Sequence, residues 1–267
     1  MVRPKLGKGK NLTDEECAAW RAHFRKLSNS ARYDEAYALA RRLMKRYPKA
    51  FLFAYYEAVM TAEDDTSYTP AEKKRRFALA SKKLRRLLLR IRAAPPWLRG
   101  SVRNEYYWFS QQPHKQYRLG VERVRNGERR AYYSQGVGAV YMARKLAEKG
   151  RRGLALRWAK KAEKAWLGYY AIDASTRGWY NSYLFYAASL GYQGRLREME
   201  KALGKAAKLS GHSPNWSTIL VFRGEIEAVV ALLHPAPPTP PTPSARARSP
   251  APRRAGESRW ARRRRSR

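Results

Sequence analysis

The residue types that most often bind metals or carry catalysis are few in this chain and widely scattered. The four histidines, His23, His114, His212 and His234, lie far from one another, and none is spaced i, i+4 from another histidine or from a glutamate as helical metal sites require. Cys17 is the single cysteine, so an intrachain disulfide and a thiolate metal cluster are both excluded. We therefore expect no metal and no cofactor.

Other motifs that can do chemistry also lack a necessary component. Asp64 and Asp65 are adjacent in a Thr/Ser-containing loop, where carboxylates are usually solvated or cap a helix. Gly136-Val137-Gly138 has no third glycine, no following Lys-Ser/Thr and no preceding strand, so it does not form a phosphate-binding loop. Ser134 and Ser189 have no histidine nearby in the sequence to activate a hydroxyl. We predict that the protein is not an enzyme.

The charge of the chain indicates which partners to consider. It has 57 Lys+Arg against 21 Asp+Glu, a formal charge of +36, and +23 remains when residues 1–10 and 235–267 are set aside. Such a surplus attracts polyanions by releasing their counterions. Acidic protein segments, nucleic acids and anionic membranes are all allowed partners. A solvated surface that only reflects Arg-, Ala- and Pro-rich composition is the alternative interpretation.

Hydropathy gives the expected location. No segment reaches the roughly 18 apolar residues of a membrane span, and the longest candidate, Ile226 to Leu233, contains Glu227. The N-terminus lacks the apolar run of a secretory signal. We expect a soluble, cytoplasmic protein without a transmembrane segment, or a nuclear one if the organism is eukaryotic. The oligomeric state is not predicted.

Helical periodicity and helix-terminal signals run through residues 12–234, and no strand pattern stands out. Thr13 and Glu16 predict a capping box, and Thr69-Pro70 predicts a second helix start. Pro48 and Pro113 mark helix ends. One expected helix starts at Thr13 and runs to about Ser28, and two others end before Pro48 and before Pro113. Further single helices are expected at 51–61, at the basic helix 73–92 that Thr69-Pro70 opens, and at 115–125. Helical pairs are expected at 128–170 and 175–209, with a last, shorter pair at 214–233 pivoting on 223–225.

Three stretches share one spacing of bulky and small residues. The shared positions are Trp20, Ala36 and Pro48 in the first, Ala143, Gly150, Ala155 and Ala162 in the second, and Ala187, Gly194 and Ala206 in the third. This pattern resembles tetratricopeptide repeats, in which antiparallel helical hairpins stack on their neighbours. The last two units are 44 residues apart, which predicts an insertion around 167–177.

The resemblance implies an all-α, TPR-like α-solenoid over residues 12–234. A basic, disordered N-terminal arm (1–11) precedes it and a disordered Pro/Arg-rich tail (235–267) follows. The family uses a concave groove lined by first helices to hold a peptide or partner protein. The residues that we assign to this groove are Arg21, Arg25, Arg144, Asn181, Tyr107 and Trp108. A full carboxylate clamp is absent, so the resemblance implies an acidic partner of no specified sequence.

The strongest electrostatic element is the predicted helix that begins at Thr69-Pro70. From Lys73 to Arg92 it has ten basic residues and no acidic one, while its apolar stripe is expected to pack inward. The helix cations that we expect on its exposed face and assign to polyanion binding are Lys74, Arg75, Lys82, Lys83, Arg86 and Arg90. The tail residues assigned to the same role are Arg262, Arg263, Arg264 and Arg265. This favours RNA or DNA binding as the alternative to a protein scaffold; a solvated face remains the plain interpretation.

Overall fold

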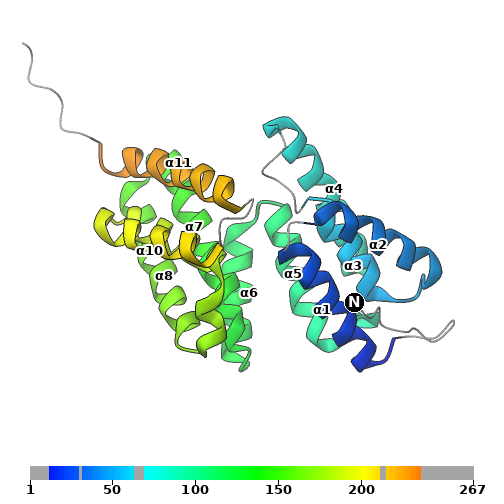
Figure 1. Ribbon diagram of the computed structural model, residues 1–267. Coiled ribbons are helices and arrows are strands. Elements are labelled where there is room, and N and C mark those ends of the chain that lie inside the picture. Colours follow the sequence, from blue (N-terminus) through cyan, green and yellow to red (C-terminus); the bar gives the residue numbers. More distant parts are fainter. Residues whose placement is uncertain (1–11, 30–31, 63–68, 211–214, 236–267) are drawn as a thin grey trace, which may run out of the picture. The chain divides into compact units, whose positions relative to one another are not determined.

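The structure is a computed structural model that describes residues 12–29, 32–62, 69–210 and 215–235. Within these ranges every regular element is a helix and no strand occurs, which confirms the predicted all-α class (Figure 1). None of the helices described has both the length and the apolar character that a membrane crossing needs. The predicted arm, the loop with Asp64 and Asp65, and the tail with its terminal arginines lie outside the described residues.

Five α-helices build the first part of the fold around a core of large side chains. They are α1 (Asp14–Asn29), α2 (Tyr33–Arg46), α3 (Phe51–Met60), α4 (Pro70–Leu89) and α5 (Pro96–Phe109). Trp20, Phe24 and Phe53 are buried together, with Trp20 edge-on to Phe53 at a centroid distance of 5.6 Å. Aromatic burial of this kind is a large stabilising contribution.

Six further α-helices pack around a second core that combines many alanines with larger side chains. They are α6 (Pro113–Arg125), α7 (Tyr132–Glu148), α8 (Arg152–Tyr170), α9 (Tyr180–Gly191), α10 (Leu196–Ser210) and α11 (Asn215–Leu233). Helix α7 packs on α8 and α9 packs on α10, while α9 also contacts α7 and α11. Buried alanines, such as Ala143 on α7 and Ala159 on α8, allow these helices to pack closely around Trp166.

Local signals in the sequence place several helix ends where they were predicted. Thr13 and Glu16 form the capping box, with Glu16 N donating to Thr13 Oγ1 at 3.2 Å and Thr13 N donating to Glu16 Oε2 at 2.8 Å. Thr69 Oγ1 accepts from Glu72 N at the start of α4. Gly150 follows α7 with a φ of +69°, a conformation that favours glycine.

Helix α7 lies unusually close to α6, because a glycine stands at their contact. A β-carbon at Gly138 would lie 2.7 Å from the backbone nitrogen of Tyr117 and 2.8 Å from the carbonyl oxygen of Pro113. Backbone atoms cannot move aside as a flexible side chain can. The Gly136–Gly138 segment is thus part of helix–helix packing and fixes where α7 presents its side chains.

The predicted helical pair at 214–233 is wrong: α11 is one helix that continues through residues 223–225. A glycine inside a helix costs only about 1 kcal/mol relative to alanine. Arg223 offsets part of that cost by donating to Glu227 Oε1 at 2.9 Å, one turn away. Ile226 and Val229 are buried against the core, so packing keeps the helix continuous across Gly224.

Candidate functional site

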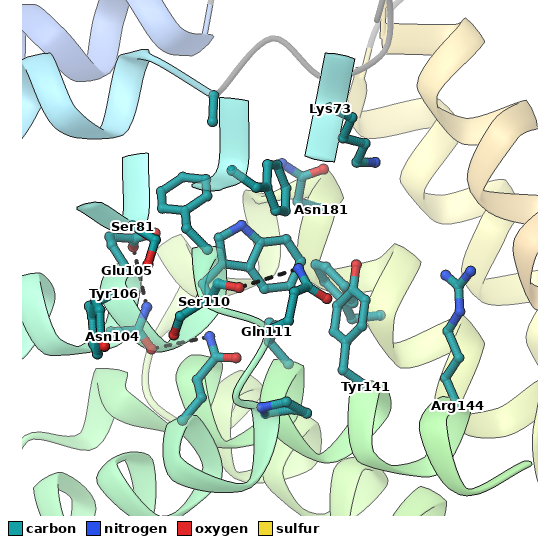
Figure 2. Close-up of a pocket in the computed structure, with 18 of the residues that line it drawn as sticks. Lys73, Ser81, Asn104, Glu105, Tyr106, Ser110, Gln111, Tyr141, Arg144 and Asn181 are labelled. Carbon is teal, nitrogen blue, oxygen red and sulfur yellow. Dashed lines mark hydrogen bonds between the residues drawn. The ribbon is translucent and has the colours of Figure 1, made fainter. Parts of the chain in front are cut away.

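A large groove lies among the described helices. It has a cavity volume of about 1750 Å³ and is lined by α4, α5, α7, α9 and α11, with the start of α6 beneath (Figure 2). We call it the α4–α11 groove. Its lining includes Lys74, Lys82, Glu105, Trp108, Tyr141, Arg144, Asn181 and Phe222.

One wall of the groove is a basic face of α4. Lys74, Lys82 and Arg85 lie in the lining, separated by about two turns and then one. Phe77, at the edge of this stripe, is buried against α5 and so holds α4 in place. The N-cap at Thr69 sets where the helix begins, so local capping and the apolar stripe together direct these cations toward the groove.

Aromatic side chains form a connected floor. Trp108 lies edge-on to Tyr141 with a centroid distance of 4.7 Å and contacts Phe77 at 6.2 Å, which links α5 to both α7 and α4. On the far side, Phe185 lies edge-on to Phe222 at 5.1 Å. Edge-to-face contacts favour fixed ring positions, so the floor is largely pre-formed.

Arg144 lies in the groove, but its guanidinium is already engaged. It donates to Glu148 Oε1 at 3.0 Å on its own helix and to Glu225 Oε2 at 2.8 Å on α11. Burial opposes the charge of Arg144, but these two carboxylates outweigh it and raise the pKa of the guanidinium. The group therefore joins α7 to α11 and offers little free charge to a ligand.

A polar chain that the sequence analysis missed lies at the α5 side of the groove. Gln116 Nε2 donates to Asn104 Oδ1 at 3.2 Å, and Asn104 Nδ2 donates to Glu105 Oε1 at 3.2 Å. Burial raises the pKa of Glu105 to about 7, although the Asn104 bond and the charge of Arg123 act in the opposite direction. No signal in the sequence indicated this hydrogen-bond chain, because the cluster of aromatic residues is the distinguishing feature of the surrounding segment.

The structure brings together half of the predicted groove residues. Arg144, Asn181 and Trp108 line the α4–α11 groove, whereas the other three do not. Arg21 lies over the Trp97 ring with its guanidinium carbon 5.2 Å from the centroid, Arg25 is exposed on α1, and Tyr107 contacts Tyr106 beside the groove. The described groove thus contains residues of two predicted first helices, α7 and α9, but not of α1.

The residues predicted to form the polyanion-binding ridge separate into three groups. Lys74 and Lys82 line the groove, and Arg75, Arg86 and Arg90 are exposed outside it. Arg262, Arg263, Arg264 and Arg265 lie outside the described residues.

The prediction for Lys83 is wrong, because its side chain does not lie on the exposed face of α4. Its Nζ is 2.5 Å from Glu57 Oε1 and 2.8 Å from Thr61 Oγ1, and its side chain is 21% exposed. At this position α4 faces α3, so the lysine neutralises a poorly exposed carboxylate.

In the described part of the chain, no three His, Cys, Asp or Glu side chains are grouped as a metal site would need. The groove lining combines basic, acidic and aromatic side chains, and burial raises the pKa of one of its carboxyl groups, that of Glu105. Comparison of the chain with protein-family models, with curated proteins and with solved structures gives no match.

Proposed function

We propose that the chain is a non-enzymatic scaffold of TPR-like helical hairpins, stacked as an α-solenoid, whose α4–α11 groove binds an acidic segment of a partner protein. The packing of α7 on α8, of α9 on α10, and of α9 on α7 supports the stacked arrangement. Each hairpin then covers the apolar face of the next, as repeat proteins require.

The observation that carries the proposal is uncompensated positive charge in the groove. Four basic side chains of the lining have no carboxylate within 4 Å among the described residues: Lys74, Lys82, Arg85 and Lys145. Three acidic residues line the same groove: Glu148 and Glu225 are bound by Arg144, and Glu105 lies on α5, so the four cations outnumber the one remaining carboxylate. A segment rich in Asp or Glu satisfies this charge pattern, and complementary charge also speeds association.

The aromatic floor adds a second requirement on the partner. Trp108, Tyr141 and Phe185 offer large, rigid contact surfaces that lose little side-chain entropy when a ligand binds. A segment made of carboxylates alone would leave these rings uncovered. We therefore expect the bound segment to combine acidic residues with apolar ones.

The test compares two charge-reversal variants with the same change in net charge. Lys74→Glu/Lys82→Glu/Arg85→Glu alters the groove, and Arg157→Glu/Lys160→Glu/Lys164→Glu alters exposed residues of α8 that do not line it. Binding of a labelled 15-residue peptide of glutamate, alanine and leucine is followed by fluorescence anisotropy at 0.15 M salt. The groove variant is expected to bind at least about tenfold more weakly, and the α8 variant to change little. Equal losses would reject the groove as the site.

A second candidate function, RNA or DNA binding, is favoured by the outer face of α4. Arg86 and Arg90 are exposed there without a carboxylate partner among the described residues, and Arg75 has only a 3.9 Å contact to Glu72. This candidate predicts tight binding of a single-stranded oligonucleotide of about 20 nucleotides, with an affinity that falls by orders of magnitude when the salt concentration rises from about 0.05 M to about 0.2 M. Capture of partners from lysate that disappears after nuclease treatment would favour it over the protein scaffold.

A further inference from the structure

Glu105 differs from the other poorly exposed carboxylates of this protein. Glu57, with 12% of its side chain exposed, is paired with Lys83, and Glu163, with 17% exposed, is paired with Arg195. Glu105 is partly buried, yet among the described residues its side chain has one hydrogen bond, from the Asn104 amide, and no basic group within 4 Å. In a chain with 57 Lys+Arg, a carboxylate left without a cation needs an explanation.

The neighbouring side chains hold Glu105 without neutralising it. Gln116 orients the Asn104 amide, which in turn donates to Oε1 of Glu105, while Oε2 has no hydrogen-bond donor among the described residues. Arg123, the basic residue whose charge acts on Glu105, is committed elsewhere, because its Nε and Nη2 donate to Glu128 at 3.0 and 2.7 Å. The carboxylate is therefore positioned in the groove lining with acceptor capacity to spare.

We propose that Glu105 accepts hydrogen bonds from one lysine or arginine side chain of the segment that docks in the groove. This rests on the proposed function. Figure 2 shows Glu105 and Tyr106 together at one side of the groove, and Trp108 lines the groove from the same helix. The aliphatic stem of such a side chain suits this aromatic lining, and its charged end is expected to reach the carboxylate. The groove then selects an acidic segment that contains a single basic residue, because a wholly acidic segment would place like charge against Glu105.

The experiment scans one arginine through every position of the labelled Glu/Ala/Leu peptide and pairs each peptide with a twin that has citrulline instead. Citrulline keeps the shape of arginine but has no charge. A charge-assisted hydrogen bond predicts that, at one or two adjacent positions, the arginine peptide binds about tenfold more tightly than its twin.

Three variants identify the residue responsible. Glu105→Gln is expected to abolish the preference for arginine, and Glu105→Asp, which keeps the charge but shortens the reach, to reduce it. Glu122→Gln removes the same charge from an exposed site on α6 outside the groove and is expected to keep the preference. Thermal melting by circular dichroism confirms that each variant is folded.

Two results would overturn the assignment. Equal binding of arginine and citrulline peptides at every position, or an arginine preference that persists in Glu105→Gln, would reject Glu105 as the acceptor while the acidic-segment proposal stands. Absence of binding by every peptide would reject both.

Discussion

Two neighbouring lysines of α4 lie in opposite surroundings. Lys83 faces α3, where Glu57 and the hydroxyl of Thr61 neutralise it, and it is mostly covered. Lys82 lines the groove and has no carboxylate partner among the described residues. The cations of a basic helix are thus available to a ligand only on the faces where they do not form ion pairs with neighbouring helices. The total charge of the chain does not show which faces those are.

The carboxylates of the two regions show the same contrast. On α3, Glu57 is paired with a lysine; in the groove, the partner of Glu105 among the described residues is an amide. The first arrangement stabilises the fold, whereas the second leaves a charge that costs free energy until a ligand supplies a cation. Substitutions on the two sides of α4 should therefore differ in both size and sign.

The largest effect is expected from Lys83→Met, which leaves Glu57 poorly exposed and without its cation. The free energy of unfolding should fall by about 2–3 kcal/mol, because a desolvated carboxylate then loses its partner. Lys82→Met serves as the matched control and should change stability by no more than about 0.5 kcal/mol. Urea denaturation of the full chain measures both; similar losses for the two variants would refute the contrast.

The next effect is on pH dependence. The pKa of Glu105 is raised to about 7 by burial, so its favourable contribution is present below the unfolded-state pKa near 4.5 and is lost as the pH rises through about 7. Glu105→Gln should therefore be more stable than wild type by about 2 kcal/mol at a pH near 8, estimated from the size of such a shift and discounted for partial exposure. At a pH near 4 we expect no gain. If the difference in stability between Glu105→Gln and wild type is the same at both pH values, the burial of an unpaired charge is contradicted.

The smallest effect is expected at the opposite wall of the groove. Glu225→Gln removes one of the two carboxylates that bind Arg144, in a pair whose side chains are 34% and 32% exposed. Because Glu148 remains and solvent screens the pair, stability should fall by only about 0.5–1 kcal/mol. A shift in thermal midpoint as large as that of Lys83→Met would show that solvent screens this pair less than its exposure implies.

Much of the fold was predictable because its signals are local. The Thr13–Glu16 capping box, the Thr69-Pro70 start and the stop before Pro48 each involve residues within about four positions of one another. The pair predicted at 214–233 failed for the opposite reason. Gly224 is a weak local signal, and contacts of Ile226 and Val229 with distant helices override it.

The candidate site was predictable only in part. Trp108, Arg144 and Asn181 were assigned to a groove and do line one, but Arg21 and Arg25 lie elsewhere, because α1 does not contribute to its lining. Glu105 carries no distinguishing pattern in the sequence. It becomes notable only in the folded structure, where no basic side chain of the described ranges pairs with it.

Local sequence was enough to predict most of the helices, several of their caps and the excess of positive charge, because those depend on residue type and on neighbours a few positions away. Tertiary structure alone decided which charged side chains form ion pairs within the protein and which remain available to a ligand. Lys83 and Glu57 are 26 residues apart, and Arg144 and Glu225 are 81 apart, so only packing brings them together. Electrostatic interactions depend on distance in space and on burial, and neither can be read from positions along the chain.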